Sequence, residues 1–317
     1  MVIRKLNPHL NLNRYQYKGW ISVKIAIFND NQLGLVLLDE QKIVDVSAAA
    51  NWDTNQPDAS FKYLVENFET LKPMMEMERK TGKAFKLSEV HLKSPVPATG
   101  KIWAAPVNYK KHQEEMNMQF NNAPLTIEDL ALFLKSPDSL SGPMDSIRLP
   151  FKDRRTDHEA ELGYVVGKKA KNVKAEDAKD YIFGYFALLD ISIRGNEERT
   201  WRKSFDTFTP IGPWIVTADE IEDPNHLSIK LWVNDELRQD GNTKHLIYDC
   251  YKCFEVACKH MQLKPGDIIA TGTPEGVGPL NPGDSVRIEI DQIGGFTVQV
   301  ESAEEEKSKD HDEYLYR

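Results

Sequence analysis

Two glutamates, Glu159 and Glu161, stand two positions apart in the segment DHEAELGYVVG. The apolar residues that follow indicate a β-strand, on which side chains two positions apart emerge on the same face, about 7 Å from each other. Like charges on one face of a partly buried strand repel and lose hydration. A divalent cation offsets this cost best, and carboxylate oxygens select Mg²⁺, Mn²⁺ or Ca²⁺. The pair is a candidate metal site, and a solvated edge strand is the alternative.

A third acid, Asp190, ends the apolar run in YFALLDISIRG. A strand that stops at this residue could deliver its carboxylate into a cleft, where it would add a third hard oxygen ligand. Asp190 is therefore the candidate third ligand.

Further groups with acid–base or electrostatic potential lie outside these strands. In NYKKHQEEMN, His112 and Glu115 are three positions apart, so on a helix the carboxylate could orient the imidazole as a general base. In RKSFDTFTPIGPW, Lys203 could stabilise an oxyanion as a fixed positive charge. The alternatives are an exposed His–Glu pair and an ordinary solvated lysine.

Two segments offer groups for an anionic ligand. The loop ATGTPEGVGPLNPGD lacks the phosphate-loop pattern, but its backbone N–H groups and Thr273 could bind a carboxylate or carbonyl oxygen. In RGNEERTWRKS, Arg194, Arg199 and Arg202 are close together, and an arginine there could pair with a substrate carboxylate. A solvated basic loop that balances neighbouring glutamates is the alternative.

The elements that must position these groups are mostly short strands. Residues 1–20 are polar and aperiodic and are expected to form an arm. Residues 21–95 begin with alternating apolar residues and an NDNQ turn and continue at helical spacing, which predicts a small β-rich domain. The proline-rich segment KSPVPATG is the candidate linker. Residues 96–300 hold many β-like runs between Gly and Pro residues, and 301–317 form a charged tail. The fold class predicted is α+β, mostly β.

Composition narrows the class of protein. The 317 residues carry a net charge of −9, which argues against a nucleic-acid partner. We find no apolar run of about 18 residues for a membrane span, and the first residues lack the pattern of an export signal. The chain has three cysteines, in the helix-like stretch YDCYKCFEVACKHM, and they are expected to be ordinary buried residues. A cytoplasmic protein is expected.

Taken in order, several segments of residues 101–300 resemble the fumarylacetoacetate hydrolase family. They are NYKKHQEE, LFLKSPDSLSGP, DHEAELGYVVG, GYFALLDISIRG, RKSFDTFTPIGPWIVTADEI, LWVNDELRQDGNT and LKPGDIIATGTPEGVGPLNPGD. The resemblance implies a catalytic mixed β-roll, a homodimer, and a Mg²⁺ or Mn²⁺ site on Glu159, Glu161 and Asp190. It also implies that His112, Glu115 and Lys203 are catalytic. Lys135, Arg194, Glu197 and Thr273 would bind the substrate.

Two positions depart from the family pattern. Glu197 stands where many members carry a glutamine that touches the substrate, and AAPV precedes Asn108 where many have a Val-Gly pair. Both lie where the substrate is expected to sit.

The implied activity is metal-dependent hydrolysis of a C–C bond in a short 1,3-dicarbonyl keto acid, such as an acylpyruvate or fumarylacetoacetate, through a metal-stabilised enolate. Decarboxylation of a β-keto acid or keto–enol isomerisation at the same site is the alternative enzymatic activity. An alternative of another class is a protein that binds a small molecule with the metal but catalyses no reaction. Such a protein needs no general base, so the presence of His112 argues against it.

Overall fold

The computed structural model describes residues 23–120 and 126–302, without the side chains of 116–120. The predicted arm, 1–20, lies outside the described residues. The predicted tail, 301–317, also lies outside them except for its first two residues.

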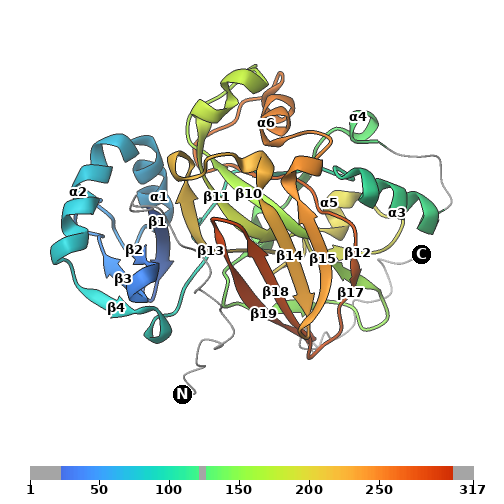
Figure 1. Ribbon diagram of the computed structural model, residues 1–317, viewed down its shortest axis with the longest axis horizontal. Helices are drawn as coiled ribbons and strands as arrows, with labels where there is room; N and C mark the ends of the chain where they lie inside the picture. Colours follow the sequence, from blue (N-terminus) through green and yellow to red (C-terminus); the bar gives the residue numbers. More distant parts are fainter. Residues whose placement is uncertain (1–22, 121–125, 303–317) are drawn as a thin grey trace, which may run out of the picture.

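A mixed sheet of 11 strands runs through the molecule (Figure 1). Its order is β4-β3-β2-β1-β13-β11-β10-β16-β5-β6, and β7 pairs with β13. The central strands β10 and β11 are buried along their whole length, as their uninterrupted apolar runs predict. Within residues 96–300 the strands of this sheet are β5 (Ile102–Ala104), β6 (Phe133–Lys135), β7 (Leu140–Ser141), β10 (Ala160–Val166), β11 (Ile182–Leu189), β13 (Thr209–Thr217) and β16 (Ile268–Ala270).

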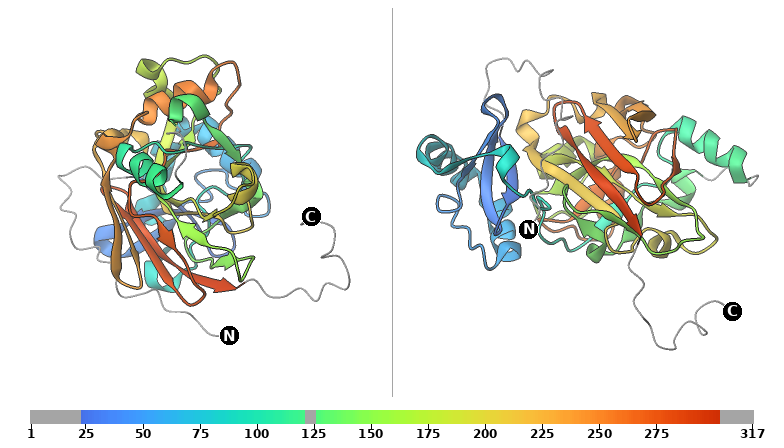
Figure 2. Two further views of the ribbon diagram at one scale, coloured as in Figure 1. Left: turned by 90° about the vertical axis from the view of Figure 1, so that its right-hand side faces the viewer. Right: turned by 90° about the horizontal axis from the view of Figure 1, so that it is seen from below.

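The first part of the chain adds four strands and two helices to this sheet. The strands are β1 (Lys24–Phe28), β2 (Gln32–Leu37), β3 (Lys42–Asp45) and β4 (Ala84–Lys86), and the helices are α1 (Pro57–Glu66) and α2 (Phe68–Thr81). The β1–β2 turn falls on the predicted NDNQ segment, and the two helices confirm the helical spacing. β1 pairs with β13, with Ile25 opposite Ile215, so the first strands continue the central sheet. Figure 2 shows this part beside the remaining strands.

The helices α1 and α2 share a core with the central sheet. The ring of Phe183, on β11, meets Phe61 of α1 and Phe68 of α2 edge to face, at centroid distances of 6.4 and 5.0 Å. Such aromatic pairs add to the stabilisation that burial already provides. The first part of the chain and residues 96–300 therefore bury apolar surface against each other.

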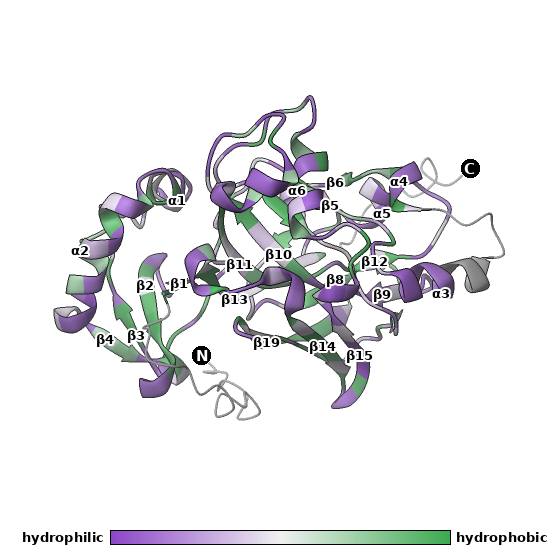
Figure 3. Cartoon of the chain, turned by 45° about the horizontal axis from the view of Figure 1, so that its top comes forward, coloured by the Kyte–Doolittle hydropathy of each residue, from purple (hydrophilic) through white to green (hydrophobic). Residues whose placement is uncertain are grey.

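A second, five-stranded sheet covers the other face of the central strands. Its order is β15-β14-β18-β19-β8, and its strands are β8 (Ile147–Leu149), β14 (Ser228–Val233), β15 (Glu236–Asn242), β18 (Ser285–Ile290) and β19 (Gly294–Ser302). Buried and half-buried residues alternate along β14 and β18, which is typical of strands with one face on a core. Leu162 of β10 and Ile288 of β18 belong to the same buried cluster. In Figure 3 strands such as β1 and β2 are coloured mostly hydrophobic, whereas the edge strand β15 is largely hydrophilic.

The remaining elements are short. A three-stranded sheet has the order β12-β9-β17, formed by β12 (Ser192–Ile193), β9 (Thr156–His158) and β17 (Gly278–Pro279). The other α-helices among the described residues are α3 (Lys110–Phe120), α4 (Ile127–Leu130), α5 (Arg199–Arg202) and α6 (Cys250–Cys258). All three cysteines are buried and free on α6, as expected. Across the described ranges, every helix is too short or too polar to span a bilayer.

The predicted fold class is confirmed, because strands in mixed sheets dominate the architecture. The runs IWAAPV, ELGYVVG, IFGYFALLDI, PWIVTADEI, SIKLWVN, SVRIEI and FTVQV all contain strands.

Candidate metal centre

The strands β10 and β11 bring the three predicted ligands to one end of a hairpin. They pair antiparallel with Ala160 opposite Leu189, and the backbone N–H of Asp190 donates to the carbonyl of Glu159 at 2.9 Å. Glu159 comes directly before β10 and Asp190 directly after β11, so this pairing fixes the distance between their backbones. Glu161 is on β10, two residues after Glu159, and its side chain emerges on the same face.

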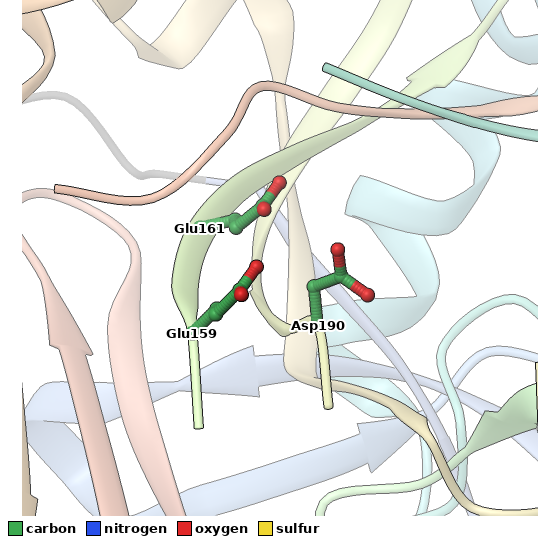
Figure 4. Close-up of side chains that lie close together, drawn as sticks. All are labelled: Glu159, Glu161 and Asp190. Carbon is green, nitrogen blue, oxygen red and sulfur yellow. The ribbon is translucent and has the colours of Figure 1, made fainter. Parts of the chain in front are cut away.

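The three carboxylates converge on a common space. One oxygen from each of Glu159, Glu161 and Asp190 lies within 4.8 Å of the others. Figure 4 shows the three side chains close together, with Glu159 and Glu161 on one segment and Asp190 on its neighbour. Their residues are only 5%, 1% and 1% exposed, so water screens their charges poorly. Three hard oxygen donors at this separation are a donor set that suits Mg²⁺ or Mn²⁺.

Two lysine side chains lie against these carboxylates. The Lys203 Nζ donates to Glu159 Oε2 at 2.7 Å and to Asp190 Oδ2 at 2.6 Å. From β6, the Lys135 Nζ donates to Asp190 Oδ1 at 2.5 Å and to the carbonyl of Phe208 at 2.8 Å. Both lysines are buried, with exposed fractions of 6% for Lys203 and 2% for Lys135. Their charges offset part of the repulsion within the carboxylate cluster.

Arg194 binds carboxylates of the protein itself. Its Nε donates to Asp157 Oδ2 at 2.6 Å, and its Nη2 donates to Glu159 Oε1 at 2.9 Å. Arg155 also donates to both oxygens of Asp157, at 2.7 and 3.1 Å. The guanidinium of Arg194 therefore orients Glu159. The sequence predicts that Arg194 contacts a substrate carboxylate. Such a contact would use the remaining N–H groups of Arg194.

The surroundings push the pKa values of the two glutamates in opposite directions. Burial opposes ionisation of Glu159, but the charges of Lys203 and Arg194 outweigh it and hold the pKa of this carboxyl below its ordinary value. Burial, followed by the nearby charge of Asp190, raises the pKa of Glu161 well above its ordinary value. A bound divalent cation would favour the ionised form of both carboxyls.

The glycine-rich loop after β16 completes the centre. The Gly272 N–H donates to Glu161 Oε2 at 2.7 Å. Gly272 has a φ of +93°, and a Cβ there would lie 2.8 Å from the Cβ of Asn108, so this close approach requires glycine. The Asn108 Nδ2 in turn donates to the carbonyl of Thr271 at 2.8 Å. Thr273, the predicted substrate-binding residue, is buried next to these contacts.

Gln239, on β15, connects this loop to the strand that carries the glutamates. Its Nε2 donates to Thr273 Oγ1 at 2.8 Å, and its Oε1 accepts from the Ala160 N–H at 3.0 Å. Sequence reasoning missed Gln239, although it lies within the matching segment LWVNDELRQDGNT. It also missed Asp157 as a partner of Arg194 and Asn108 as a support of the loop.

The predicted His–Glu pair is present on α3. The Nδ1 of His112 lies 3.2 Å from Glu115 Oε2. His112 is only 4% exposed, and a positive charge on its ring would lower the pKa of Glu159, so the imidazole lies close to the centre.

Glu197 lies in a different environment from the other predicted site residues. It is exposed, and its two carboxylate oxygens accept from Arg154 Nη1 and Nη2, each at 2.9 Å. Its predicted contact with substrate stays a prediction.

The part of the chain that resembles known proteins includes all the residues of the metal centre. Residues 101–301 match the family model described as fumarylacetoacetate (FAA) hydrolase, C-terminal. The chain is 41% identical to a maleylpyruvate hydrolase of Aquipseudomonas alcaligenes, over 88% of this chain and 100% of that protein. It is also 35% identical to a mitochondrial oxaloacetate tautomerase of Xenopus laevis, over 93% of this chain and 96% of that protein.

A solved structure shares the fold over most of the chain. The maleylpyruvate hydrolase of Sphingobium sp. SYK-6, in complex with manganese (II) ion and pyruvate, superimposes with a TM-score of 0.79. It is 42% identical, and the match covers 88% of this chain and 99% of that one.

Proposed function

Because the chain belongs to the fumarylacetoacetate hydrolase family, we propose that it is a Mg²⁺- or Mn²⁺-dependent hydrolase that cleaves a C–C bond of an acylpyruvate. The convergence of Glu159, Glu161 and Asp190 in a buried space carries this proposal. The similarity to a hydrolase structure that holds manganese and pyruvate supports it.

Glu159, Glu161 and Asp190 would hold the cation, which supplies Lewis-acid stabilisation of the negative charge that develops on the keto acid oxygens. Lys203 and Lys135 hold Asp190, and Arg194 holds Glu159, so the ligand carboxylates are oriented before the cation binds. The Gly272 N–H does the same for Glu161.

His112 and Glu115 would activate the water. With Nδ1 donating to the Glu115 carboxylate, Nε2 is the ring nitrogen that can accept a proton from water. The water oxygen attacks the acyl carbon remote from the pyruvyl group, and the bond between this carbon and the pyruvyl CH₂ breaks. The proton that Nε2 took from the water is then transferred to the pyruvyl CH₂, which becomes the methyl group of pyruvate, while the attacked carbon becomes the second carboxylic acid. Lys203 and Thr273 would stabilise the oxyanion formed at the attacked carbon.

The first test measures products from a panel of acylpyruvates, maleylpyruvate among them, with the purified protein and Mn²⁺ or Mg²⁺. We expect two carboxylic acids in equal amounts, and no turnover after chelation of the metal. A Glu159→Gln/Asp190→Asn double variant should fold without binding Mn²⁺ tightly, whereas His112→Ala should bind Mn²⁺ and lose hydrolysis. Tight Mn²⁺ binding by the double variant would contradict the ligand assignment.

Tautomerisation of a β-keto acid is the second candidate function, since the chain is 35% identical to an oxaloacetate tautomerase. This reaction needs charge stabilisation and proton transfer but no attack by water. Interconversion of keto and enol oxaloacetate, followed by ultraviolet absorbance without formation of two acids, would favour it. Release of CO₂ would instead indicate a decarboxylase.

We also propose a homodimer in the cytoplasm, as the sequence leads us to expect. Light scattering on the purified protein tests the dimer, and fractionation of the source cells tests the location.

A further inference from the structure

We propose that Gln239 is a positioning residue that makes the hydroxyl of Thr273 a hydrogen-bond donor toward the ligand of the metal centre. The inference rests on the proposed function, because it assigns Thr273 a role in stabilising charge on the bound keto acid. Among the described residues, the Gln239 side chain makes no hydrogen bond with Glu159, Glu161 or Asp190.

Two backbone groups determine which way the Gln239 amide faces. Its oxygen must face the Ala160 N–H, at 3.0 Å, because a backbone N–H can only donate. Its nitrogen must face the carbonyl of Pro274, at 2.9 Å, because a carbonyl can only accept. Gln239 is fully buried, with an exposed fraction of 0%, so water cannot replace either contact.

The orientation of the amide sets the direction of the next hydrogen bond. The second N–H of Gln239 reaches Thr273 Oγ1 at 2.8 Å, so the amide donates and the hydroxyl accepts. The proton of that hydroxyl then has to be donated elsewhere. Within residues 23–120 and 126–302, the Thr273 hydroxyl donates no hydrogen bond.

Thr273 directly follows the residue that supports the metal centre. The residue before it, Gly272, donates its N–H to Glu161 Oε2 at 2.7 Å. Thr273 is 2% exposed, so bulk water is not the acceptor for its proton. A buried hydroxyl with an unused proton next to a carboxylate cluster is suited to an anionic oxygen of a bound ligand.

The same amide also fixes the strand that carries the glutamates. Besides the Ala160 N–H, Gln239 Oε1 faces His158 Nδ1 at 3.2 Å, so this ring nitrogen carries the proton. Gln239 therefore makes four contacts, two that support the strand around Glu159 and Glu161 and two that support the Thr273 loop. The two functions can be separated experimentally because one uses the amide oxygen and the other the amide nitrogen.

The variant Gln239→Glu separates them. A carboxylate keeps two acceptors for Ala160 and His158 but loses both donors, so it would draw the Thr273 proton toward itself. We expect kcat for acylpyruvate hydrolysis to fall about 100-fold in Gln239→Glu, as for loss of an oxyanion donor. Thr273→Val should show a similar loss. The Kd for Mn²⁺, measured by calorimetry, should change less than about threefold in both, because the metal ligands keep their supports.

A double variant tests whether Gln239 acts through Thr273. If it does, Gln239→Glu/Thr273→Val should be no more than about threefold slower than Thr273→Val alone, since coupled residues are not additive. The matched control is Thr243→Val, which removes another buried hydroxyl that accepts from the Leu227 N–H and donates to the Pro224 carbonyl, each at 2.8 Å. This control should keep kcat within about twofold.

Oxalate binding separates a failure of this inference from a failure of the proposed function. If the unaltered protein hydrolyses no acylpyruvate, the proposed function is wrong. Calorimetry with Mn²⁺ and oxalate then still tests Gln239, and we expect Gln239→Glu and Thr273→Val each to bind oxalate about tenfold more weakly. A kcat or oxalate Kd in Gln239→Glu equal to that of the unaltered protein would overturn the inference, as would losses that multiply in the double variant.

Discussion

Val107 adopts a backbone conformation that a β-branched residue rarely takes. Its φ is +43°, in the left-handed region that glycine favours. The next residue, Asn108, supports the loop of the metal centre through the carbonyl of Thr271. Val107 ends the segment AAPV, where the sequence departs from the Val-Gly pair that the family resemblance implies, so this departure coincides with local strain. Such strain persists where the surrounding structure holds the backbone in place.

We expect glycine at this position to be more stable than alanine. Val107→Ala keeps a Cβ in the left-handed region, whereas Val107→Gly removes it and gains about 1 kcal/mol relative to the alanine variant. Chemical denaturation of both variants measures the difference in the free energy of unfolding. Equal stability of the two would show that the conformation at Val107 is not strained.

Loss of Lys203 should destabilise the protein most when no metal is bound. Its ammonium lies between Glu159 and Asp190, so Lys203→Met leaves these buried carboxylates with less positive charge. In the presence of a chelator we expect a loss of about 3–5 kcal/mol in the free energy of unfolding. Added Mn²⁺ should raise the melting temperature more in Lys203→Met than in the unaltered protein. A variant as stable as the unaltered protein in the chelator would contradict this.

Individual residues were predictable where a local pattern constrained them. Alternation along a strand placed Glu159 and Glu161 on one face, and helical spacing placed His112 beside Glu115. Gln239 was not predictable, because the sequence ELRQDGN is polar and indicates an exposed strand. Its burial depends on the loop that covers it, which is distant in the sequence.

At the scale of elements, the small sheet β12-β9-β17 holds the end of the ligand hairpin. β12 pairs with β9, with Ser192 opposite Asp157. Asp190 and Arg194 flank β12, and Asp157 lies on β9 next to His158 and Glu159. The pairing therefore places Arg194 where it can bind Asp157 and Glu159 together.

Weakening this support should reduce the affinity for metal. In Asp157→Asn the partner of Arg194 loses its charge, so the guanidinium is held less firmly and orients Glu159 less well. We expect the Kd for Mn²⁺ to rise about 10-fold, the lower end of the range for residues that support metal ligands. Calorimetry provides the measurement. Asp240→Asn, which removes an exposed pair with Lys230, is the control and should leave the Kd unchanged.

The long strands were predictable from sequence because their apolar runs are uninterrupted, as in β10 and β11. The order of strands in the sheet was not predictable from the sequence. Pairing of β1 with β13 joins residues that are far apart in the chain, and hydropathy carries no information about which strand edges meet. The contribution of Lys135 to the centre depends in the same way on where β6 lies in the sheet.

At the scale of the whole molecule, one continuous sheet and one shared core connect the first part of the chain with the metal centre. β1 pairs with β13, and β13 pairs with β11, which ends at the residue before Asp190. Phe183, on the same β11, packs against Phe61 and Phe68. The two parts should therefore depend on each other for stability.

We expect a single cooperative unfolding transition for the described parts of the chain. Phe61→Ala should lower the free energy of unfolding by about 3–5 kcal/mol, the cost of removing a buried aromatic ring. Calorimetry should show one peak whose calorimetric and van't Hoff enthalpies agree. Two separate peaks, with only one shifted by Phe61→Ala, would indicate two independent units.

The hairpin of β10 and β11 has a second end, remote from the carboxylates. Between Val166 and Ile182 the chain turns back, and Lys168 and Lys169 there are exposed. All three native cysteines are buried, so a cysteine introduced at Lys168 would be the most accessible thiol among the described residues. A fluorescent dye or a surface linker could be attached at that turn, far along the hairpin from the carboxylates of the metal centre.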